Sequence, residues 1–233
     1  MSYTPHAAPF LAWPASIASL EEKTRVAREI AARAVDGEIV GIGSGTAAYL
    51  VLQRLAERRR EEGLALRVVG TSHEIEIAAV QLGVDVLPLG QVTPAWMVDG
   101  ADEVDPAGRI LKGRGGALFR EKLLWSSCET RLLAIDPSKR VGRLGTKFSV
   151  PIEVHPSCVT TVVARAIELG AARAELRMGN GKDGPVVTET GFLLLEASFD
   201  DGVPPSFHEQ VKLLPGVLET GLFEGYAVEI VGA

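Results

Sequence analysis

The chain has 233 residues, of which 46% are hydrophobic and 23% are charged, and its net charge is −6. This balance offers no basic surface for a nucleic acid, and the one basic run, at 58–60, is followed at once by Glu61 and Glu62. Two cysteines are too few for a disulfide framework, and no apolar stretch reaches the ~18 residues of a membrane span. We therefore expect a cytoplasmic globular protein that binds neither nucleic acid nor membrane.

The first half of the chain alternates between apolar segments and helical patterns. Residues 1–18 contain three prolines, which predict an irregular N-terminal arm. Ser19 and Glu22 have the S-x-x-E spacing of a capping box, so a helix should begin there and run to about Val35. The predicted strands that follow are 38–42, 66–70, 84–89, 95–98 and 131–135, and the predicted helices are 46–60, 73–82 and 117–128. Apolar strands alternating with helices indicate a doubly wound α/β fold with a mainly parallel sheet.

The order of elements changes at about residue 147. A strand at 148–154, a helix at 159–169, a strand at 172–178, a hairpin-like segment at 186–199 and a helix at 207–214 follow. The order β-α-β-β-α-β predicts a small α+β domain with an antiparallel sheet. The apolar segment 217–231 is expected to return to the first sheet. The predicted organisation is a main domain at 19–147, completed by 220–233, and a small domain at 148–219.

A glycine-rich loop, GIGSGT at 41–46, stands where a predicted strand meets a helix. Glycines permit close backbone approach, and a helix N-terminus presents free N–H groups to an anion. Ser44 and Thr46 add hydroxyl groups. The loop lacks the lysine of a Walker motif, and the next strand ends in GTS at 70–72 rather than in the acid of a dinucleotide site. It predicts a site for a monophosphate or a hydroxyl-rich ligand, the alternative being a tight turn without a ligand.

An acidic turn, DGADE at 99–103, follows directly on the apolar run 96–98. Open parallel sheets bind their ligands at the carboxyl ends of strands. Asp99 and Asp102 lie three residues apart around Gly100, so both side chains can point into one cleft. A solvated acidic turn is the alternative.

A second glycine loop, KGRGG at 112–116, leads into the helix that carries Glu121. A lysine before glycines at a helix start suits an anion. Ala117 and Trp125 lie four residues on either side of Glu121, which places this carboxylate on an apolar face. A carboxylate held there suits a general base, whereas an exposed one would pair with a neighbouring basic residue.

No metal or cofactor site is predicted. The four histidines are scattered, and neither cysteine has the neighbours of a metal ligand or a nucleophile. Two aspartates, a lysine and a glutamate instead fall within 23 residues, from Asp99 to Glu121. Proton transfer next to a carbonyl needs a carboxylate base and a positive charge where the enediolate develops. These residue types therefore fit an enzyme that works without metal or cofactor.

Five segments in order carry a resemblance to a known family: VGIGSGTAA, DGADE, KGRGGALFREK, DPSK at 136–139 and PGVLETGLF. Over residues 19–232 the chain resembles the ribose-5-phosphate isomerase A family. The resemblance implies a Rossmann-like catalytic domain with a small ferredoxin-like lid domain. It implies interconversion of ribose 5-phosphate and ribulose 5-phosphate, a step of the pentose phosphate pathway, without a cofactor. It also implies a homodimer or homotetramer.

The resemblance assigns a role to each matching residue. Glu121 would move a proton between the first and second sugar carbons, and Asp99 would assist ring opening and hydroxyl proton transfer. Asp102 and Lys112 would orient and neutralise the enediolate. The implied substrate-binding positions are Lys23, Ser44, Gly45, Thr46, Ala47, Gly100, Ala101, Gly113, Arg114, Gly115 and Lys139.

Two departures from the family pattern leave the substrate preference open. Arg114 stands where the family usually has glycine, and Ala47 replaces a usual threonine. Arg114 can enter the cleft, or it can point outward or pair with an acid such as Glu103, and we expect the second arrangement.

Two other functions of the protein stay open. A sugar-phosphate-sensing regulatory domain would need the first glycine loop but not Glu121, and an acyl-CoA transferase-like fold would use a glutamate to form a thioester.

Overall fold

The computed structural model describes residues 17, 19–181 and 183–232, so nearly all of the expected N-terminal arm lies outside the described residues. The chain packs as two compact units. Unit 1 contains the chain up to Gly100, Leu123–Pro137 and the residues from Ala227 on, and unit 2 contains Ala101–Lys122 and Ser138–Tyr226. The predicted domain boundaries at 147/148 and 219/220 do not coincide with this division by packing, and they stay a prediction.

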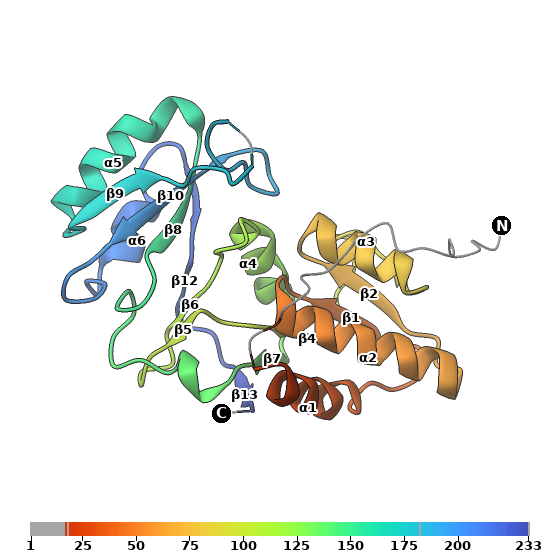
Figure 1. The fold of residues 1–233 in the computed structure, drawn as a ribbon. Coiled ribbons are helices and arrows are strands. Elements are labelled where there is room, and N and C mark those ends of the chain that lie inside the picture. The colour runs from red at the N-terminus through yellow and green to blue at the C-terminus, as the bar shows by residue number, and fades with distance from the viewer. Residues whose placement is uncertain (1–16, 18, 182, 233) are drawn as a thin grey trace. The chain divides into compact units, whose positions relative to one another are not determined.

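Unit 1 is built on a six-stranded sheet in the order β13-β7-β4-β1-β2-β3, in which every pairing is parallel (Figure 1). This order is that of a Rossmann-like fold, and the return of the last segment to the first sheet is confirmed. The strands are β1 (Ile39–Ile42), β2 (Arg67–Gly70), β3 (Asp85–Val86), β4 (Trp96–Asp99), β7 (Arg131–Ala134) and β13 (Glu229–Val231). The strand expected at 84–89 is reduced to the two residues of β3.

Helices cover both faces of this sheet. The helices are α1 (Leu20–Ala31), α2 (Thr46–Glu62), α3 (His73–Gln81) and α4 (Leu118–Ser127), which begins in unit 2 and ends in unit 1. Val40 and Ile42 join one buried cluster with α1 and α2. Gly41, between them, faces the other side, where a Cβ would lie 3.1 Å from the side chain of Leu124. Successive side chains of a strand point to opposite faces, so the doubly wound prediction is confirmed.

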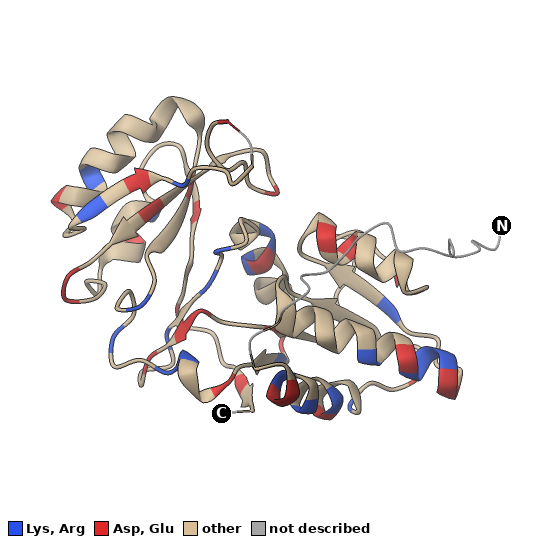
Figure 2. Cartoon of the chain, viewed as in Figure 1, with Lys and Arg blue, Asp and Glu red and all other residues tan. Residues whose placement is uncertain are grey.

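The start of α1 and the end of α2 can be compared with the capping box and the charged helix end predicted from the sequence. Ser19 has a left-handed backbone (φ 55°), and its side chain makes no capping hydrogen bond to a described residue, so the predicted capping box is wrong. A capping side chain needs an extended backbone at this position, which the turn into α1 does not give. At the end of α2, where Figure 2 shows both signs of charge, Arg58 pairs with Glu62 at 2.6 Å. Residues 60–62 are exposed as expected, but Arg58 and Arg59 are half-buried, and Arg58 also donates to the Ala31 and Ala34 carbonyls.

Unit 2 contains an antiparallel four-stranded sheet in the order β11-β8-β10-β9. With its helices it has the order β-α-β-β-α-β, so the ferredoxin-like arrangement is confirmed. The elements are β8 (Val150–Val154), α5 (Val159–Glu168), β9 (Arg173–Leu176), β10 (Leu193–Ser198), α6 (Phe207–Lys212) and β11 (Val217–Thr220), with short 3-10 turns η1 (Pro137–Lys139) and η2 (Pro156–Cys158). The hairpin-like segment at 186–199 keeps regular strand structure only in β10.

A second, three-stranded sheet in unit 2 was not predicted from the sequence. It consists of β5 (Glu103–Val104), β6 (Ile110–Leu111) and β12 (Leu222–Phe223), all antiparallel neighbours. Strands of two residues carry no periodic signal, because pairing with a distant segment is what defines them. Within the part of the chain that the structure describes, no helix is both long and apolar enough to cross a membrane.

Candidate active site

The first glycine loop lies against Asp99, which begins the acidic turn, inside unit 1. The loop connects β1 to α2, and Gly43 N–H donates to the Val98 carbonyl at 2.8 Å. A Cβ on Gly43 would lie 2.2 Å from the carboxyl carbon of Asp99, so only glycine allows this approach. Gly100 stands beside α2, where a Cβ would lie 3.7 Å from that of Ala47. The two segments that the sequence singled out therefore come together at the carboxyl ends of β1 and β4.

Asp99 is fully buried and held by two hydrogen bonds. Its Oδ1 accepts from Gly100 N–H at 2.8 Å, and its Oδ2 accepts from the indole Nε1 of Trp125 at 3.1 Å. The residue pattern around Trp125 predicts only an apolar helix face and not this contact. A buried indole N–H needs an acceptor, which is the one signal that pointed to it.

A small pocket in unit 1 brings two of the predicted substrate-binding residues together. Lys23, from α1, and Ala47, from α2, both line it. The remaining lining residues are Glu22, Val26, Ala134, Ile135 and Asp136. Ser44 and Thr46, on the adjoining loop, are half-buried, and Gly45 is exposed with φ 89°. The start of α2, with Gly45 at the surface, thus suits an anion.

The carboxylate–lysine pair lies in unit 2. The Lys112 ammonium is 3.0 Å from Oε1 of Glu121, and both side chains are buried. Lys112 follows β6 directly, and Glu121 lies in the first turn of α4, where its N–H donates to the Ala117 carbonyl at 2.8 Å. An exposed glutamate, the alternative considered above, is therefore excluded. The buried ammonium stabilises a carboxylate here and would equally stabilise an enediolate oxygen.

Asp102 lies near the same charges. Its N–H donates to the Leu111 carbonyl at 2.8 Å, which places it beside β6. Burial raises the pKa of the Asp102 carboxyl above its ordinary value, and the charge of Glu121 adds to this effect. The cations Lys112, Arg114 and Lys139 act in the opposite direction. Asp102 is therefore electrostatically coupled to the buried pair.

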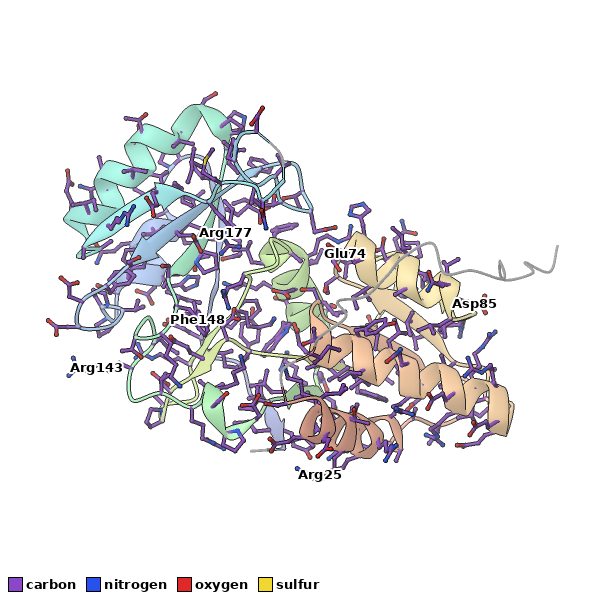
Figure 3. The ribbon with its side chains drawn as sticks, viewed as in Figure 1. Arg25, Glu74, Asp85, Arg143, Phe148 and Arg177 are labelled. Atoms are coloured by element: carbon purple, nitrogen blue, oxygen red, sulfur yellow. The ribbon has the colours of Figure 1, made fainter. Side chains whose placement is uncertain are left out.

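Arg114, the departure from the family pattern, is stacked rather than free. Its guanidinium carbon lies 4.1 Å from the centre of the Phe148 ring, and Nη1 lies 3.8 Å from Oδ1 of Asp102. Arg177 Nη1 donates to the Arg114 carbonyl; Phe148 and Arg177 are both labelled in Figure 3. The Arg114 side chain is 49% exposed. It therefore pairs with a neighbouring acid, as expected, but that acid is Asp102.

Glu103, the partner suggested for Arg114, has another function. It is fully buried, and its carboxylate accepts from three backbone N–H groups, those of Gly145, Lys147 and Phe148, at 2.6, 2.6 and 2.8 Å. The suggested Arg114–Glu103 pair is wrong because Glu103 anchors the 145–148 loop instead. A carboxylate with three such donors anchors the loop. The spacing of residues along the sequence does not predict these three hydrogen bonds.

The remaining predicted residues of unit 2 are Ala101, Lys139 and two glycines of the lysine–glycine loop. Gly113 is buried and its carbonyl accepts from Gly116 N–H at 3.0 Å, while Gly115 is exposed. Ala101 is half-buried. Lys139 ends η1, and its ammonium lies 5.9 Å from the Phe148 ring. Among the described residues, no group of three or more His, Cys, Asp or Glu side chains is arranged to hold a metal ion.

These features define a class of protein. Unit 1 combines a Rossmann-like sheet with the buried Asp99 and a helix start suited to an anion, and unit 2 combines a ferredoxin-like sheet with the buried Lys112–Glu121 pair. That combination is typical of an α/β enzyme that moves protons on an anionic substrate.

Comparison with known proteins agrees with this class. The family model described as ribose 5-phosphate isomerase A (phosphoriboisomerase A) matches residues 67–233. Ribose-5-phosphate isomerase A of Thermosynechococcus vestitus is 41% identical over 209 residues, covering 88% of each chain. That of Methanothermobacter thermautotrophicus is 39% identical over 195 residues, covering 82% of this chain and 84% of the relative. The chain belongs to the ribose 5-phosphate isomerase A family.

Solved structures show the same fold. Ribose 5-phosphate isomerase A from Methanocaldococcus jannaschii superimposes with a TM-score of 0.85 at 31% identity, covering 91% of this chain and 94% of that one. A D-ribose-5-phosphate isomerase in complex with phospho-erythronic acid gives a TM-score of 0.84 at 33% identity, with the same coverage.

Proposed function

We propose that this chain is an aldose–ketose isomerase that interconverts ribose 5-phosphate and ribulose 5-phosphate through an enediolate. The observation that carries the proposal is the buried pair of Lys112 and Glu121, at 3.0 Å. The names of its relatives support the substrate, as does a related structure in complex with phospho-erythronic acid. A sensing domain would need no buried base beside an ammonium.

Glu121 is the proposed base. In the direction of ribulose 5-phosphate, its carboxylate removes the proton from C2, and the C–H electrons form a C1–C2 double bond while O1 takes the negative charge. The same carboxyl then returns the proton to C1 as the O2 hydroxyl proton is lost and the C2 carbonyl forms. Lys112, whose ammonium lies 3.0 Å from Oε1 of Glu121, stabilises the enediolate charge. Asp102 orients the reacting oxygens.

Asp99 is proposed to move the hydroxyl proton between O2 and O1 and to assist opening of the sugar ring. Hydrogen bonds from Gly100 N–H and Trp125 Nε1 orient the carboxylate. An oriented carboxylate can pass a proton between two neighbouring hydroxyl oxygens in either direction.

The phosphate group is proposed to bind at the first glycine loop. The start of α2 offers backbone N–H groups and the hydroxyls of Ser44 and Thr46, and Lys23 lines the adjoining pocket with Ala47. The remaining proposed substrate contacts are Gly45, Gly100, Ala101, Gly113, Arg114, Gly115 and Lys139. Ala47 provides no hydroxyl, so backbone donors and Lys23 carry more of the binding.

Conversion of ribose 5-phosphate tests the function directly. Purified protein should produce ribulose 5-phosphate from ribose 5-phosphate, should not isomerise unphosphorylated ribose, and should keep its rate after exhaustive EDTA treatment. An inactive apoprotein restored by a divalent ion would overturn the carboxylate–lysine scheme in favour of Lewis-acid catalysis. Tight binding of ribose 5-phosphate without conversion would instead identify a sensing domain.

We also propose that the chain acts in the cytoplasm as a homodimer or homotetramer. Cys128 and Cys158 are both free thiols, which suits a reducing compartment. Ile77 and Val80 on α3 and Leu123 on α4 are exposed apolar side chains of unit 1 that self-association would cover. Light scattering of the purified protein would measure the mass, and a monomer at micromolar concentration would contradict the assembly.

A further inference from the structure

A buried lysine stands next to the proposed base. Lys122 follows Glu121 in α4 and is only 9% exposed. Its ammonium donates to Oε1 of Glu219 at 2.9 Å, to the Thr220 carbonyl at 3.0 Å and to the Leu222 carbonyl at 2.8 Å. The three N–H groups of the ammonium thus have three acceptors, all within residues 219–222. This segment contains the end of β11 and the start of β12.

The same segment also holds Lys112. Lys112 N–H donates to the Gly221 carbonyl at 2.9 Å, and Gly221 N–H donates to the Pro151 carbonyl at 2.8 Å. A Cβ on Gly221 would lie 2.2 Å from the Lys112 carbonyl oxygen and 2.5 Å from Cγ of Pro151, so the backbone approach requires glycine. Both members of the Lys112–Glu121 pair are therefore tied to residues 219–222, Lys112 through its backbone and Glu121 through its neighbour on the helix.

We propose that residues 219–222, acting through Lys122 and Gly221, position Lys112 and Glu121 for proton transfer. This inference rests on the proposed function. Lys122 is a positioning residue, because it acts through its hydrogen bonds to residues 219–222 and through the Phe223 ring, whose centre lies 4.7 Å from its ammonium. Since Glu121 and Lys122 are adjacent on one helix, the three hydrogen bonds of Lys122 fix the rotation and the height of α4 at the base. A displacement of ~1 Å at a catalytic group is enough to cost ~100-fold in rate.

Lys122 can be substituted without leaving Glu219 unpaired, because a second lysine lies beside the same carboxylate. Lys212, on α6, lies 3.1 Å from Oε2 of Glu219 and is much more exposed than Lys122. Burial opposes ionisation of Glu219, but Lys122, the Thr220 N–H and Lys212 lower its pKa below the ordinary value. Removal of Lys122 therefore leaves Glu219 beside another cation. Lys212 contacts the same carboxylate but not α4, which makes it a matched control.

The first experiment compares Lys122→Met with Lys212→Met and Lys122→Arg. Lys122→Met should lower kcat for ribose 5-phosphate at least ~10-fold with KM within about threefold, because orientation rather than binding is lost. Lys212→Met should leave kcat within about twofold, and Lys122→Arg, which retains donors, should recover most of the rate. Equal kcat values for Lys122→Met and Lys212→Met would overturn the proposal.

A second comparison separates positioning from stability. The double variant Lys122→Met/Glu219→Gln removes both buried charges but still lacks the bonds to the Thr220 and Leu222 carbonyls. Its kcat should stay as low as that of Lys122→Met, whatever its unfolding temperature, because these bonds are still absent. A kcat restored together with stability would show that Lys122 only neutralises Glu219, against the proposal.

Amide hydrogen exchange provides a measure that does not depend on turnover. In Lys122→Met the amides of residues 111–113 and 118–124 should exchange faster than in the wild type, and in Lys212→Met they should not. A wild-type protein inactive toward ribose 5-phosphate would refute the proposed function, yet this exchange difference would still test the link between α4 and residues 219–222. Unchanged exchange in Lys122→Met would overturn it.

Discussion

The ammonium nitrogen of Lys112 lies 3.0 Å from Oε1 of Glu121, and the two residues are 4% and 2% exposed. At this separation and burial, screening by water is weak, so each charge strongly stabilises the other. Removal of one partner leaves a buried charge without compensation. Any substitution in this pair is therefore expected to change the stability of the protein as well as its catalytic rate.

Glu121→Gln should abolish isomerisation while leaving substrate binding largely intact. The amide keeps the shape of the side chain but cannot accept the C2 proton, so kcat should fall at least ~100-fold. The variant should also unfold at a lower temperature, because the Lys112 charge loses its partner. Glu129→Gln, an exposed position just beyond α4, is the control and should behave as wild type. Near-normal turnover by Glu121→Gln would remove Glu121 from the mechanism.

Gly43→Ala should damage the site through Asp99. The added Cβ would lie 2.2 Å from the Asp99 carboxyl carbon, so the carboxylate or the loop has to move. We expect kcat/KM to fall at least ~10-fold, which corresponds to about 1.4 kcal/mol of transition-state stabilisation. Gly142→Ala adds the same methyl group where no atom lies within 4 Å and should leave both constants unchanged. Wild-type kinetics in Gly43→Ala would show that Asp99 tolerates displacement.

Arg114→Gly, which introduces the residue usual in the family, should leave KM for ribose 5-phosphate within a few-fold of wild type. The guanidinium is already engaged by the Phe148 ring and by Asp102, and its side chain is 49% exposed, so water screens its charge. Steady-state kinetics of the two proteins would measure the effect. A tenfold rise in KM, worth ~1.4 kcal/mol, would mean that the Arg114 side chain contributes strongly to substrate affinity.

His208 should make the protein sensitive to mild acid. Burial, together with the nearby charges of Lys122 and Lys212, lowers the pKa of His208 from 6.5 to about 4, while Glu219 opposes the shift. Between pH 6.5 and 4 the unfolded chain binds a proton at this residue and the folded chain does not. The contribution of His208 to stability is therefore present above pH 6.5 and is lost as the pH falls toward 4.

His208→Asn keeps a polar side chain beside Thr220 Oγ1, which lies 2.7 Å from His208 Nδ1 in the wild type, and removes the titration. The difference in unfolding free energy between pH 7.5 and pH 5 should be smaller in the variant than in the wild type. Comparing each protein with itself cancels the lost packing. Equal differences in the two proteins would place the folded-state pKa of His208 near its ordinary value.

Periodicity and local chemistry were enough to predict most of the fold. The apolar strands of unit 1, their alternation with helices and the β-α-β-β-α-β order of unit 2 all follow from spacing within about 20 residues. The same local signals placed Gly43 and Asp99 each at the end of a strand, and the apolar neighbours of Glu121 predicted its burial. Each of these features depends on residues that are close in the chain.

What the sequence alone determined is therefore which residues carry charge, hydroxyl groups and backbone freedom, and on which kind of element each stands. Only the tertiary structure decided their partners. Trp125 bonds Asp99 across 26 residues and Lys122 bonds Glu219 across 97, and the two-residue strands β5, β6 and β12 exist only as pairs. Arg114 likewise pairs with Asp102 and not with the adjacent Glu103. The Glu103 carboxylate accepts hydrogen bonds from three backbone amides of the 145–148 loop instead. Such contacts depend on packing between segments that are distant in sequence, and residue spacing carries no information about that packing.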